Sequence, residues 1–217
     1  MMPIDTNSTF SSLRLRMVDS QLRARGISDA RVLDAMARVP RHEFVPETYR
    51  DQAYEDHPVV IGEGQTISQP YIVGLMLEVL ALSPGDRVLE IGTGSGYLTT
   101  LLAELTAQVV SIERHASLAD RARALLSKLG DANVRIITGD GTQGFAEAGP
   151  YNAIIVSAAA SELPQALTDQ LAEGGRMIVP VGGSESQQLQ FIRKVEGKLI
   201  IQPRELCRFV PLVRDGL

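Results

Sequence analysis

The chain has 217 residues, of which 44% are hydrophobic and 22% are charged, and this balance excludes disordered, collagen-like and integral membrane proteins. Its formal net charge of -5 provides no long-range positive field for DNA or RNA, so nucleic acid is not expected as a partner. The single cysteine excludes an internal disulfide and any metal site built from several cysteines.

The first third of the chain predicts two helices followed by a long loop. An apolar stripe over residues 13–22, ended by Gly26, predicts the first helix. Ser28 is placed to cap a second helix, which Pro40 stops. Residues 40–68 are rich in proline, glycine, aromatic and charged residues without a sustained period. They predict a long structured loop with short pieces of helix or strand, of the kind that usually carries function.

The middle of the chain has a regular alternation of apolar runs and helical stretches. A third helix is predicted from Pro70 to the turn at residues 84–86. After it, predicted strands at 87–91, 109–112, 134–138, 153–157 and 176–181 alternate with predicted helices near 97–106, 116–129 and 164–172. This alternation is typical of a parallel sheet covered by helices on both faces. Residues 189–201 predict a hairpin, and a final strand is predicted near 206–213.

These elements predict one α/β domain over residues 1–217, with a Rossmann-like, doubly wound fold. We expect a mostly parallel seven-stranded sheet with an antiparallel C-terminal strand. Residues 1–82 would form an N-terminal cap of helices and loop that carries the acceptor site, and residues 83–217 would form the cofactor-binding core.

A glycine-rich loop follows the predicted strand at 87–91 and opens a helix. Glycines there let the backbone pass close to a ligand, and the helix N-terminus presents free N–H groups. The dinucleotide fingerprint would place its third glycine where Tyr97 stands, whereas the spacing here is G-x-G-x-G. This spacing favours S-adenosylmethionine over NAD, although a tight structural turn is an alternative. The residues expected to contact the cofactor are Gly92, Thr93, Gly94, Ser95 and Gly96.

Acidic residues lie at the predicted carboxyl ends of three neighbouring strands. Glu113 closes the second strand, where its carboxylate can accept both hydroxyls of a ribose. Asp140 closes the third, and with Gly141 it is expected at the adenine end of the cofactor. For both acids the alternative is a helix cap or a surface turn. Glu90 precedes the glycine loop and is expected near the cofactor's amino group, with backbone amides at the strand end as alternative partners.

The long loop and its flanks contain the most distinctive segments of the chain. Together with the core motifs they closely resemble the protein-L-isoaspartate (D-aspartate) O-methyltransferases over about residues 17–212. The matching segments are "RVPRHEFVP" at 38–46, "AYEDHPVVIGEGQTISQPYIV" at 53–73, "VLEIGTGSGY" at 88–97, "GDG" at 139–141, "YNAIIVSAAA" at 151–160 and "RFVPL" at 208–212. Many methyltransferases share the glycine loop, whereas "GQTISQP" is far more restricted and carries most of the specificity.

The resemblance implies transfer of a methyl group from S-adenosylmethionine to the free α-carboxylate of an L-isoaspartyl residue, leaving S-adenosyl-L-homocysteine. The ester collapses to a succinimide, from which normal aspartate re-forms, so the reaction begins the repair of damaged proteins. The resemblance assigns the active site to Ser68, places Ile67 beside the cofactor, and has Val210 and Leu212 line the peptide groove.

The expected chemistry needs no general base, because a carboxylate with a pKa near 4 is already ionised at pH 7. Ser68 is therefore expected to orient the carboxylate as a hydroxyl donor, and not to attack as a nucleophile. Its alternative role is to cap the helix that begins near Pro70. His42, His57 and His115 lack the spacing of metal ligands, so no metal site is expected. His57 is expected to be a hydrogen-bonded loop residue.

The expected partners are isoaspartyl-containing proteins and peptides, bound by a cytoplasmic monomer. The sequence shows neither the apolar run of a signal peptide nor an apolar stretch long enough to cross a membrane. One alternative is a methyltransferase for another small-molecule or nucleic-acid acceptor. However, residues 157–160 lack the Asn/Asp-Pro-Pro-aromatic segment common in base methylation. The other alternative is a non-catalytic module that binds cofactor or peptide.

Overall fold

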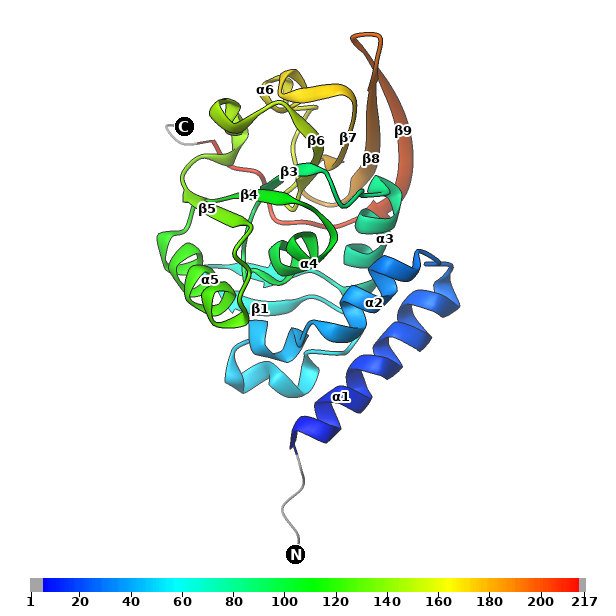
Figure 1. Ribbon diagram of the computed structural model, residues 1–217, viewed down its shortest axis with the longest axis vertical. Helices are drawn as coiled ribbons and strands as arrows, with labels where there is room; N and C mark the ends of the chain where they lie inside the picture. The colour runs from blue at the N-terminus through cyan, green and yellow to red at the C-terminus, as the bar shows by residue number, and fades with distance from the viewer. Residues whose placement is uncertain (1–5, 215–217) are drawn as a thin grey trace, which may run out of the picture.

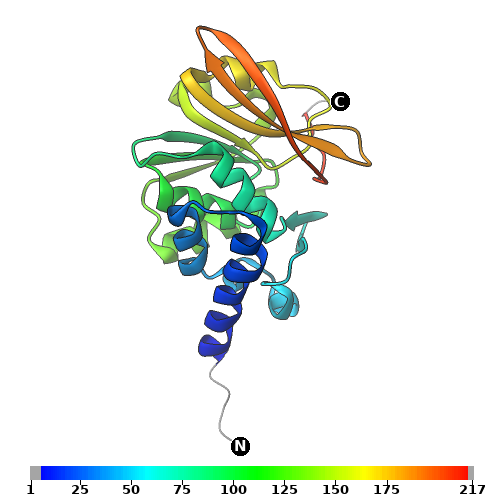
Figure 2. The ribbon, with the colours of Figure 1, turned by 90° about the vertical axis from the view of Figure 1, so that its right-hand side faces the viewer.

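The structure, a computed structural model, describes residues 6–214. Figure 1 shows a central sheet with helices on both faces, and α1 extending from the body at the end opposite to the β8–β9 hairpin; Figure 2 shows the same arrangement from the side. None of the helices within the described residues is long and apolar enough to cross a membrane.

The main sheet contains seven strands in the order β5-β4-β3-β6-β7-β8-β9. Their bounds are β3 Arg87–Ile91, β4 Gln108–Glu113, β5 Val134–Thr138, β6 Tyr151–Val156, β7 Leu171–Gly182, β8 Gln187–Val195 and β9 Lys198–Cys207. Neighbouring strands from β5 to β7 are parallel, and β8 is antiparallel to both β7 and β9. The predicted α/β fold with a mostly parallel seven-stranded sheet is confirmed, but the reversed strand is β8 and not the C-terminal strand β9, which runs in the same direction as β7.

The strand order reverses between β3 and β6, because the chain first moves outward through β4 and β5 and then returns to pair β6 with β3. In open α/β sheets this switch leaves a crevice at the carboxyl ends of the strands, where ligands bind.

Two apolar layers cover the sheet. Val88 of β3 packs in the layer formed with α3 Pro70–Leu80, α4 Tyr97–Leu105 and α5 Ala116–Leu129. Leu89 packs on the opposite face, in the layer that includes α6 Gln165–Asp169. Burial on both faces explains why β3 has a nearly continuous apolar sequence and not an alternating one.

The N-terminal cap begins with α1 Thr6–Met17, which continues as a π-helical turn and a short 3-10 turn up to Gly26, in the left-handed conformation. The next helix, α2 Ala30–Arg38, is capped by Asp29, whose side chain accepts hydrogen bonds from two backbone N–H groups. The prediction that Ser28 is the cap is therefore wrong by one residue. The backbone N–H and the hydroxyl of Ser28 donate instead to the Glu78 carboxylate of α3.

The long loop is ordered by short elements, as the sequence predicts. It contains 3-10 helices at Arg41–Phe44 and Glu47–Gln52, followed by a two-stranded antiparallel hairpin of β1 Val59–Gly62 and β2 Gln65–Ile67. The hairpin leads through Ser68 and Gln69 into α3.

The C-terminal region corrects two predictions. The helix expected at 164–172 is the shorter α6, because β7 already begins at Leu171. The final strand expected near 206–213 does not form as a separate strand. Residues 206 and 207 end β9, and the following segment crosses the end of β6, where Pro211 makes one isolated bridge with Ala159. A segment that crosses a strand end meets too few partners in register to continue a ladder, and Pro211 lacks an N–H group.

Candidate active site

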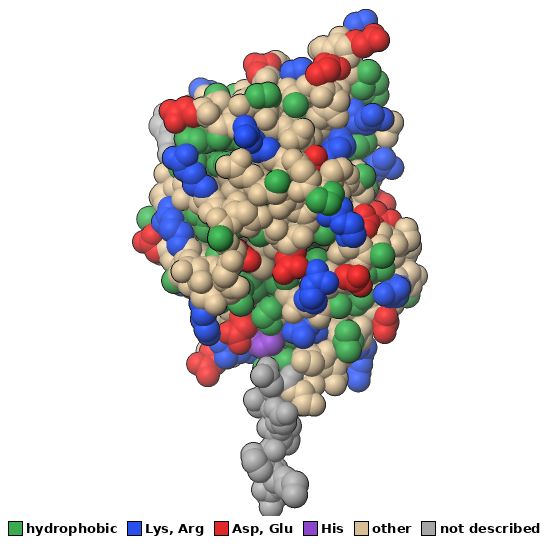
Figure 3. Space-filling model, viewed as in Figure 1, with side chains coloured by type: hydrophobic (Ala, Val, Ile, Leu, Met, Phe, Trp, Pro, Cys, Tyr) green, Lys and Arg blue, Asp and Glu red, His purple; other side chains and the backbone are tan. Residues whose placement is uncertain are grey.

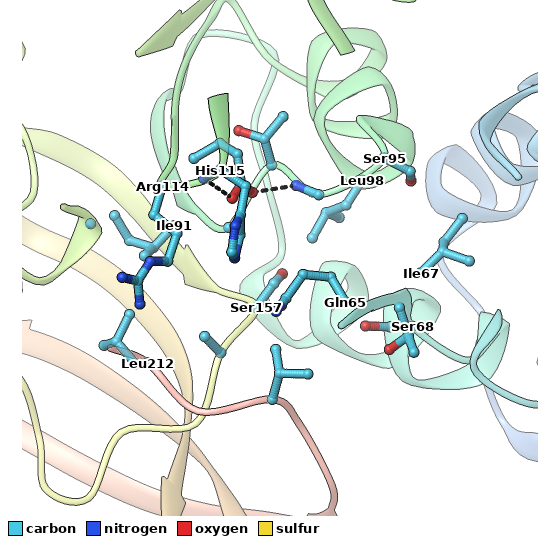
Figure 4. Close-up of a pocket in the computed structure, with 18 of the residues that line it drawn as sticks. Gln65, Ile67, Ser68, Ile91, Ser95, Leu98, Arg114, His115, Ser157 and Leu212 are labelled. Atoms are coloured by element: carbon cyan, nitrogen blue, oxygen red, sulfur yellow. Dashed lines mark hydrogen bonds between the residues drawn. The ribbon is translucent and has the colours of Figure 1, made fainter. Parts of the chain in front are cut away.

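A pocket lies at the carboxyl ends of the central strands, above the glycine loop (Figure 4). It contains about 1020 Å³ of empty space, including its opening to solvent. In Figure 4, Ile67 and Ser68 lie across the pocket from Arg114 and Leu212. Five parts of the chain supply most of its lining: residues 65–68, 91–95, 112–115, 157–158 and 210–213.

Most of the predicted site residues are brought together here. Those that line the pocket are Ile67, Ser68, Gly92, Thr93, Gly94, Ser95, Glu113, Gly141, Val210 and Leu212. Three predicted residues are not part of its lining: Glu90, Gly96 and Asp140. Each of these three has a clear structural role in holding residues that do line it.

The glycine loop needs its glycines for backbone conformation and for close packing. Gly92, Gly94 and Gly96 have φ angles of 92°, 55° and 88°, in the left-handed region that side chains rarely adopt. A Cβ on Gly96 would lie 2.8 Å from a Leu126 methyl group of α5. Gly96 therefore sets the approach of the loop to α5, while the residues before it face the pocket.

Glu113 is fixed at the pocket wall by two backbone amides. Its Oε2 accepts a hydrogen bond from the Gly94 N–H at 2.8 Å, and its Oε1 accepts one from the His115 N–H at 2.9 Å (Figure 4). The side chain is buried, and the residue lines the pocket. Each carboxylate oxygen has further lone pairs, so the group can still accept hydroxyl hydrogens from a ligand.

Asp140 caps the 3-10 turn Gly141–Gln143, because its side chain accepts a hydrogen bond from the Thr142 N–H at 2.8 Å. The helix cap, which the sequence left open as an alternative role for Asp140, is therefore confirmed. Gly141 lines the pocket beside it, and a Cβ there would lie 2.5 Å from the Ile91 side chain. Only glycine lets the backbone pass this close to the end of β3.

Glu90 is buried beneath α4. Its Oε2 accepts hydrogen bonds from the hydroxyls of Thr99 and Ser111, both at 2.6 Å. The Ser111 hydroxyl also lies 2.5 Å from that of Thr93 in the glycine loop. Burial raises the pKa of Glu90 to about 8, against the opposing effect of these hydrogen bonds, so the group is mostly neutral at pH 7. Glu90 does not line the pocket itself, but a chain of hydrogen bonds through Ser111 connects it to Thr93, which does.

Ser68 does not cap α3. The N-cap position belongs to Gln69, and the helix begins with Pro70, which needs no N–H partner. Ser68 is half-buried, and its backbone carbonyl accepts a hydrogen bond from Arg41 at 2.8 Å. Its side chain lines the pocket beside the buried Ile67.

A second groove lies next to the pocket and shares Ser68 with it as a lining residue. It contains about 940 Å³ of empty space including its opening, and it shares Thr66, Ser68, Ser157 and Val210 with the first pocket. The other lining residues are Pro58, Gln69, Ile72 and 206–209. Val210 thus faces both spaces, whereas Leu212 lines only the pocket above the glycine loop.

Several lining residues are not among those predicted from the sequence, including Gln65, Arg114, His115 and Ser157. Arg114 and His115 directly follow Glu113, and residues just beyond a strand's carboxyl end belong to the crevice of such folds, so this signal was available. His57 lies outside the pocket, hydrogen-bonded to Glu55 and the Pro58 carbonyl, which confirms its prediction as a loop residue. Within residues 6–214, no group of three or more His, Cys, Asp or Glu side chains is arranged to hold a metal ion.

Comparison with known proteins identifies the family. The chain matches the family model for Protein-L-isoaspartate(D-aspartate) O-methyltransferase over residues 14–216. A protein-L-isoaspartate O-methyltransferase from Koribacter versatilis is 54% identical over 204 residues, covering 94% of this chain and 92% of that protein. One from Methanoculleus marisnigri is 54% identical over 200 residues, covering 92% and 91%. A Plasmodium falciparum structure described as a protein-L-isoaspartate O-methyltransferase with S-adenosyl-L-homocysteine superposes with a TM-score of 0.81 at 32% identity, covering 92% of this chain and 98% of that one. The chain therefore belongs to the protein-L-isoaspartate(D-aspartate) O-methyltransferase family.

Proposed function

We propose that this protein transfers the methyl group of S-adenosylmethionine to the free α-carboxylate of L-isoaspartyl residues in damaged proteins. The cofactor supplies an electrophilic methyl group on its sulfonium. The observation that carries the proposal is the adjacency of two spaces: the pocket above the glycine loop and a second groove share Ser68 as a lining residue.

The residues of the first pocket fit S-adenosylmethionine. Glu113 presents a carboxylate that two backbone amides hold in place, and this suits the acceptance of both ribose hydroxyls. The left-handed φ angles of the loop require glycine, and glycine in turn lets the backbone pass close to the cofactor. Gly141, with Asp140 behind it, would lie at the adenine end. Glu90 would act on the cofactor site indirectly, through Thr93.

The second groove suits an anionic peptide. Arg208 is the charged side chain among its lining residues, and it is exposed where an incoming carboxylate would meet it. Ser68 lines both the groove and the pocket, so its hydroxyl would donate a hydrogen bond to one oxygen of the acceptor carboxylate. The other oxygen, already ionised at pH 7, is then directed to the methyl group without a general base.

Alignment and exclusion of water would supply most of the rate enhancement. Holding the two reacting groups in line contributes up to roughly 7–11 kcal/mol in favourable intramolecular models. Ile67, Leu98 and Val210 are among the apolar residues that line the pocket. Apolar contacts of this kind would displace the water shell that weakens a carboxylate nucleophile.

We also propose a division of labour along the chain, in which residues 1–82 supply the acceptor side and residues 83–217 supply the cofactor side. The exception is the C-terminal segment, whose residues 206–210 line the acceptor groove; two backbone hydrogen bonds of 2.7 Å that join Ala159 to Val210 and Leu212 hold this segment in place. We propose that the protein acts in the cytoplasm as a monomer, on proteins and not on nucleic acid. The interspersed acidic and basic side chains on the face shown in Figure 3, with the net charge of -5, support the last point.

Label transfer from S-adenosylmethionine to matched peptides tests the proposed function. Two peptides of identical sequence would differ only in an isoaspartyl or an ordinary aspartyl linkage. We expect base-labile label, typical of a methyl ester, on the isoaspartyl peptide only. Label on neither peptide, or equal label on both, would contradict the proposal.

A further inference from the structure

Arg41 is a buried cation whose hydrogen-bond partners are uncharged. Its side chain has no exposed surface, and burial lowers its pKa to about 10. Its Nε donates to the Ala53 carbonyl at 2.7 Å, and its Nη2 donates to the Ser68 carbonyl at 2.8 Å. Removing a guanidinium from water is costly, and an apolar side chain of similar size would avoid that cost. The buried charge is therefore poorly explained as a simple contribution to stability.

The contacts of Arg41 join the two halves of the proposed active site. Ser68 belongs to the acceptor side, between β2 and α3. The Arg41 guanidinium also lies over the ring of Tyr97, 5.0 Å from its centroid. Tyr97 is the first residue of α4, directly after the glycine loop, and it lines the pocket. One side chain thus contacts the backbone of the acceptor loop and the residue that follows the cofactor loop.

We infer that Arg41 is a positioning residue, which holds the Ser68 backbone against the start of α4 and so sets the distance between the acceptor hydroxyl and the cofactor. This inference rests on the proposed function. Charge-assisted hydrogen bonds are about twice as strong as neutral ones, and the planar guanidinium fixes two carbonyls in one geometry. Lysine would keep the positive charge but would lack the planar set of N–H donors that binds two carbonyls at once. A misplacement of about 1 Å in a reacting group can cost roughly 100-fold in rate.

Arg41→Lys, with Arg31→Lys as a matched control, tests this role. Arg31 also bridges two backbone carbonyls, those of Leu82 at 2.6 Å and Leu105 at 2.5 Å, but neither of these two residues lines a cavity, whereas Ser68 lines both. We expect Arg41→Lys to lower kcat for an isoaspartyl peptide by about 10- to 100-fold while the Kd for cofactor changes by less than about threefold. We expect Arg31→Lys to lower Tm by a similar amount with kcat within about twofold of wild type. Equal kcat in the two variants would overturn the inference.

A double-mutant cycle with Ser68→Ala separates positioning from a general loss of structure. If Arg41 acts through Ser68, then Arg41→Lys in the Ser68→Ala background lowers kcat by less than about threefold further. Fully additive losses would show that Arg41 does not act through Ser68, and the inference would fall. Arg41→Gln, whose amide can donate to one carbonyl, serves where the lysine variant does not fold. If neither folds, Arg41 is structural and the inference is wrong.

Hydrogen exchange of the protein without ligands gives a readout that does not depend on turnover. We expect backbone amides of residues 65–69 to exchange at least about tenfold faster in Arg41→Lys than in wild type or Arg31→Lys. Unchanged protection there would overturn the inference. If wild type failed to methylate the isoaspartyl peptide while this difference was present, the proposed function would fail and the positioning role would stand.

Discussion

The Oε2 atom of Glu113 lies 2.8 Å from the backbone nitrogen of Gly94 and accepts its hydrogen bond. This contact connects the end of β4 to the middle of the glycine loop. The carboxylate is therefore oriented by the protein before any ligand binds, which lowers the entropic cost of using it for recognition.

Glu113→Gln should weaken cofactor binding. The amide loses the charge that strengthens hydrogen bonds to ribose hydroxyls, and only one of its two terminal atoms can accept. We expect the Kd for S-adenosyl-L-homocysteine to rise by about 10- to 100-fold, measured by calorimetry. Glu104→Gln in α4, outside the pocket, is the control and should leave the Kd unchanged. An affinity within about twofold of wild type for Glu113→Gln would remove the residue from the proposed cofactor site.

Ser68→Ala should slow turnover with little effect on cofactor affinity. The variant loses one hydroxyl donor on a residue that lines both cavities, and loss of a single such donor typically costs about 100-fold in kcat. Steady-state assays with an isoaspartyl peptide, together with binding of S-adenosyl-L-homocysteine, would separate the two effects. Ser127→Ala, on the exposed side of α5, is the matched control. A large loss of cofactor binding in Ser68→Ala would show that its role was assigned wrongly.

Ionisation of Glu90 should lower the stability of the folded protein as the pH rises. Its pKa is raised from 4.5 to about 8 in the folded protein, because burial disfavours the charged form. A raised pKa means that the folded state binds the proton more tightly. The stabilisation from Glu90 is therefore fully present below pH 4.5 and is lost as pH rises through about 8.

Thermal unfolding of wild type and Glu90→Gln between about pH 6 and 9 checks this linkage. We expect the Tm of wild type to fall more steeply with pH, because glutamine keeps the size of the neutral acid and does not ionise. The difference between the two curves isolates Glu90 from other titrating groups. Parallel curves would mean that Glu90 does not change its ionisation in this range.

Gly96→Ala should destabilise the protein more than Gly130→Ala. Both glycines have left-handed φ angles, 88° and 89°, so alanine is strained by about 1–2 kcal/mol at either position. At Gly130 a Cβ meets no atom within 4 Å, whereas at Gly96 it would lie 2.8 Å from a Leu126 methyl group. We expect an additional loss of about 1–3 kcal/mol for Gly96→Ala, measured by urea unfolding. Equal losses of unfolding free energy in the two variants would show that α5 can move away from the new Cβ without a loss of stability.

Local patterns in the sequence were sufficient to predict the core elements. The limits of β3 and α5 agree with the predicted ranges, because β3 is an apolar run between a turn and a glycine, and α5 has a clear apolar period that ends at Gly130. The second helix was predicted too, but its cap was not, since Ser28 and Asp29 are both good caps. The choice depends on Glu78, which lies in a later helix and binds Ser28.

The site was predicted less completely, because burial and pairing depend on residues far apart in the chain. Glu90 has the right place in the motif for a cofactor contact, but Thr99 and Ser111 hold its carboxylate beneath α4. Arginine is usually a surface residue, so the sequence alone does not predict that Arg41 is buried and hydrogen-bonded to the Ser68 carbonyl. The expected final strand failed for the same reason, since its neighbour is the end of β6 and not an edge strand.

The bridge between Ala159 and Pro211 has a consequence for how the protein is made. The glycine loop and its helix can form as soon as the first half of the sheet has been synthesised. The acceptor groove cannot, because one of its walls, residues 206–210, lies at and beyond the end of β9, the last strand of the sheet. A nascent chain would thus form the glycine loop before either cavity has its last wall, because residues 210–213 line the pocket and residues 206–210 line the groove.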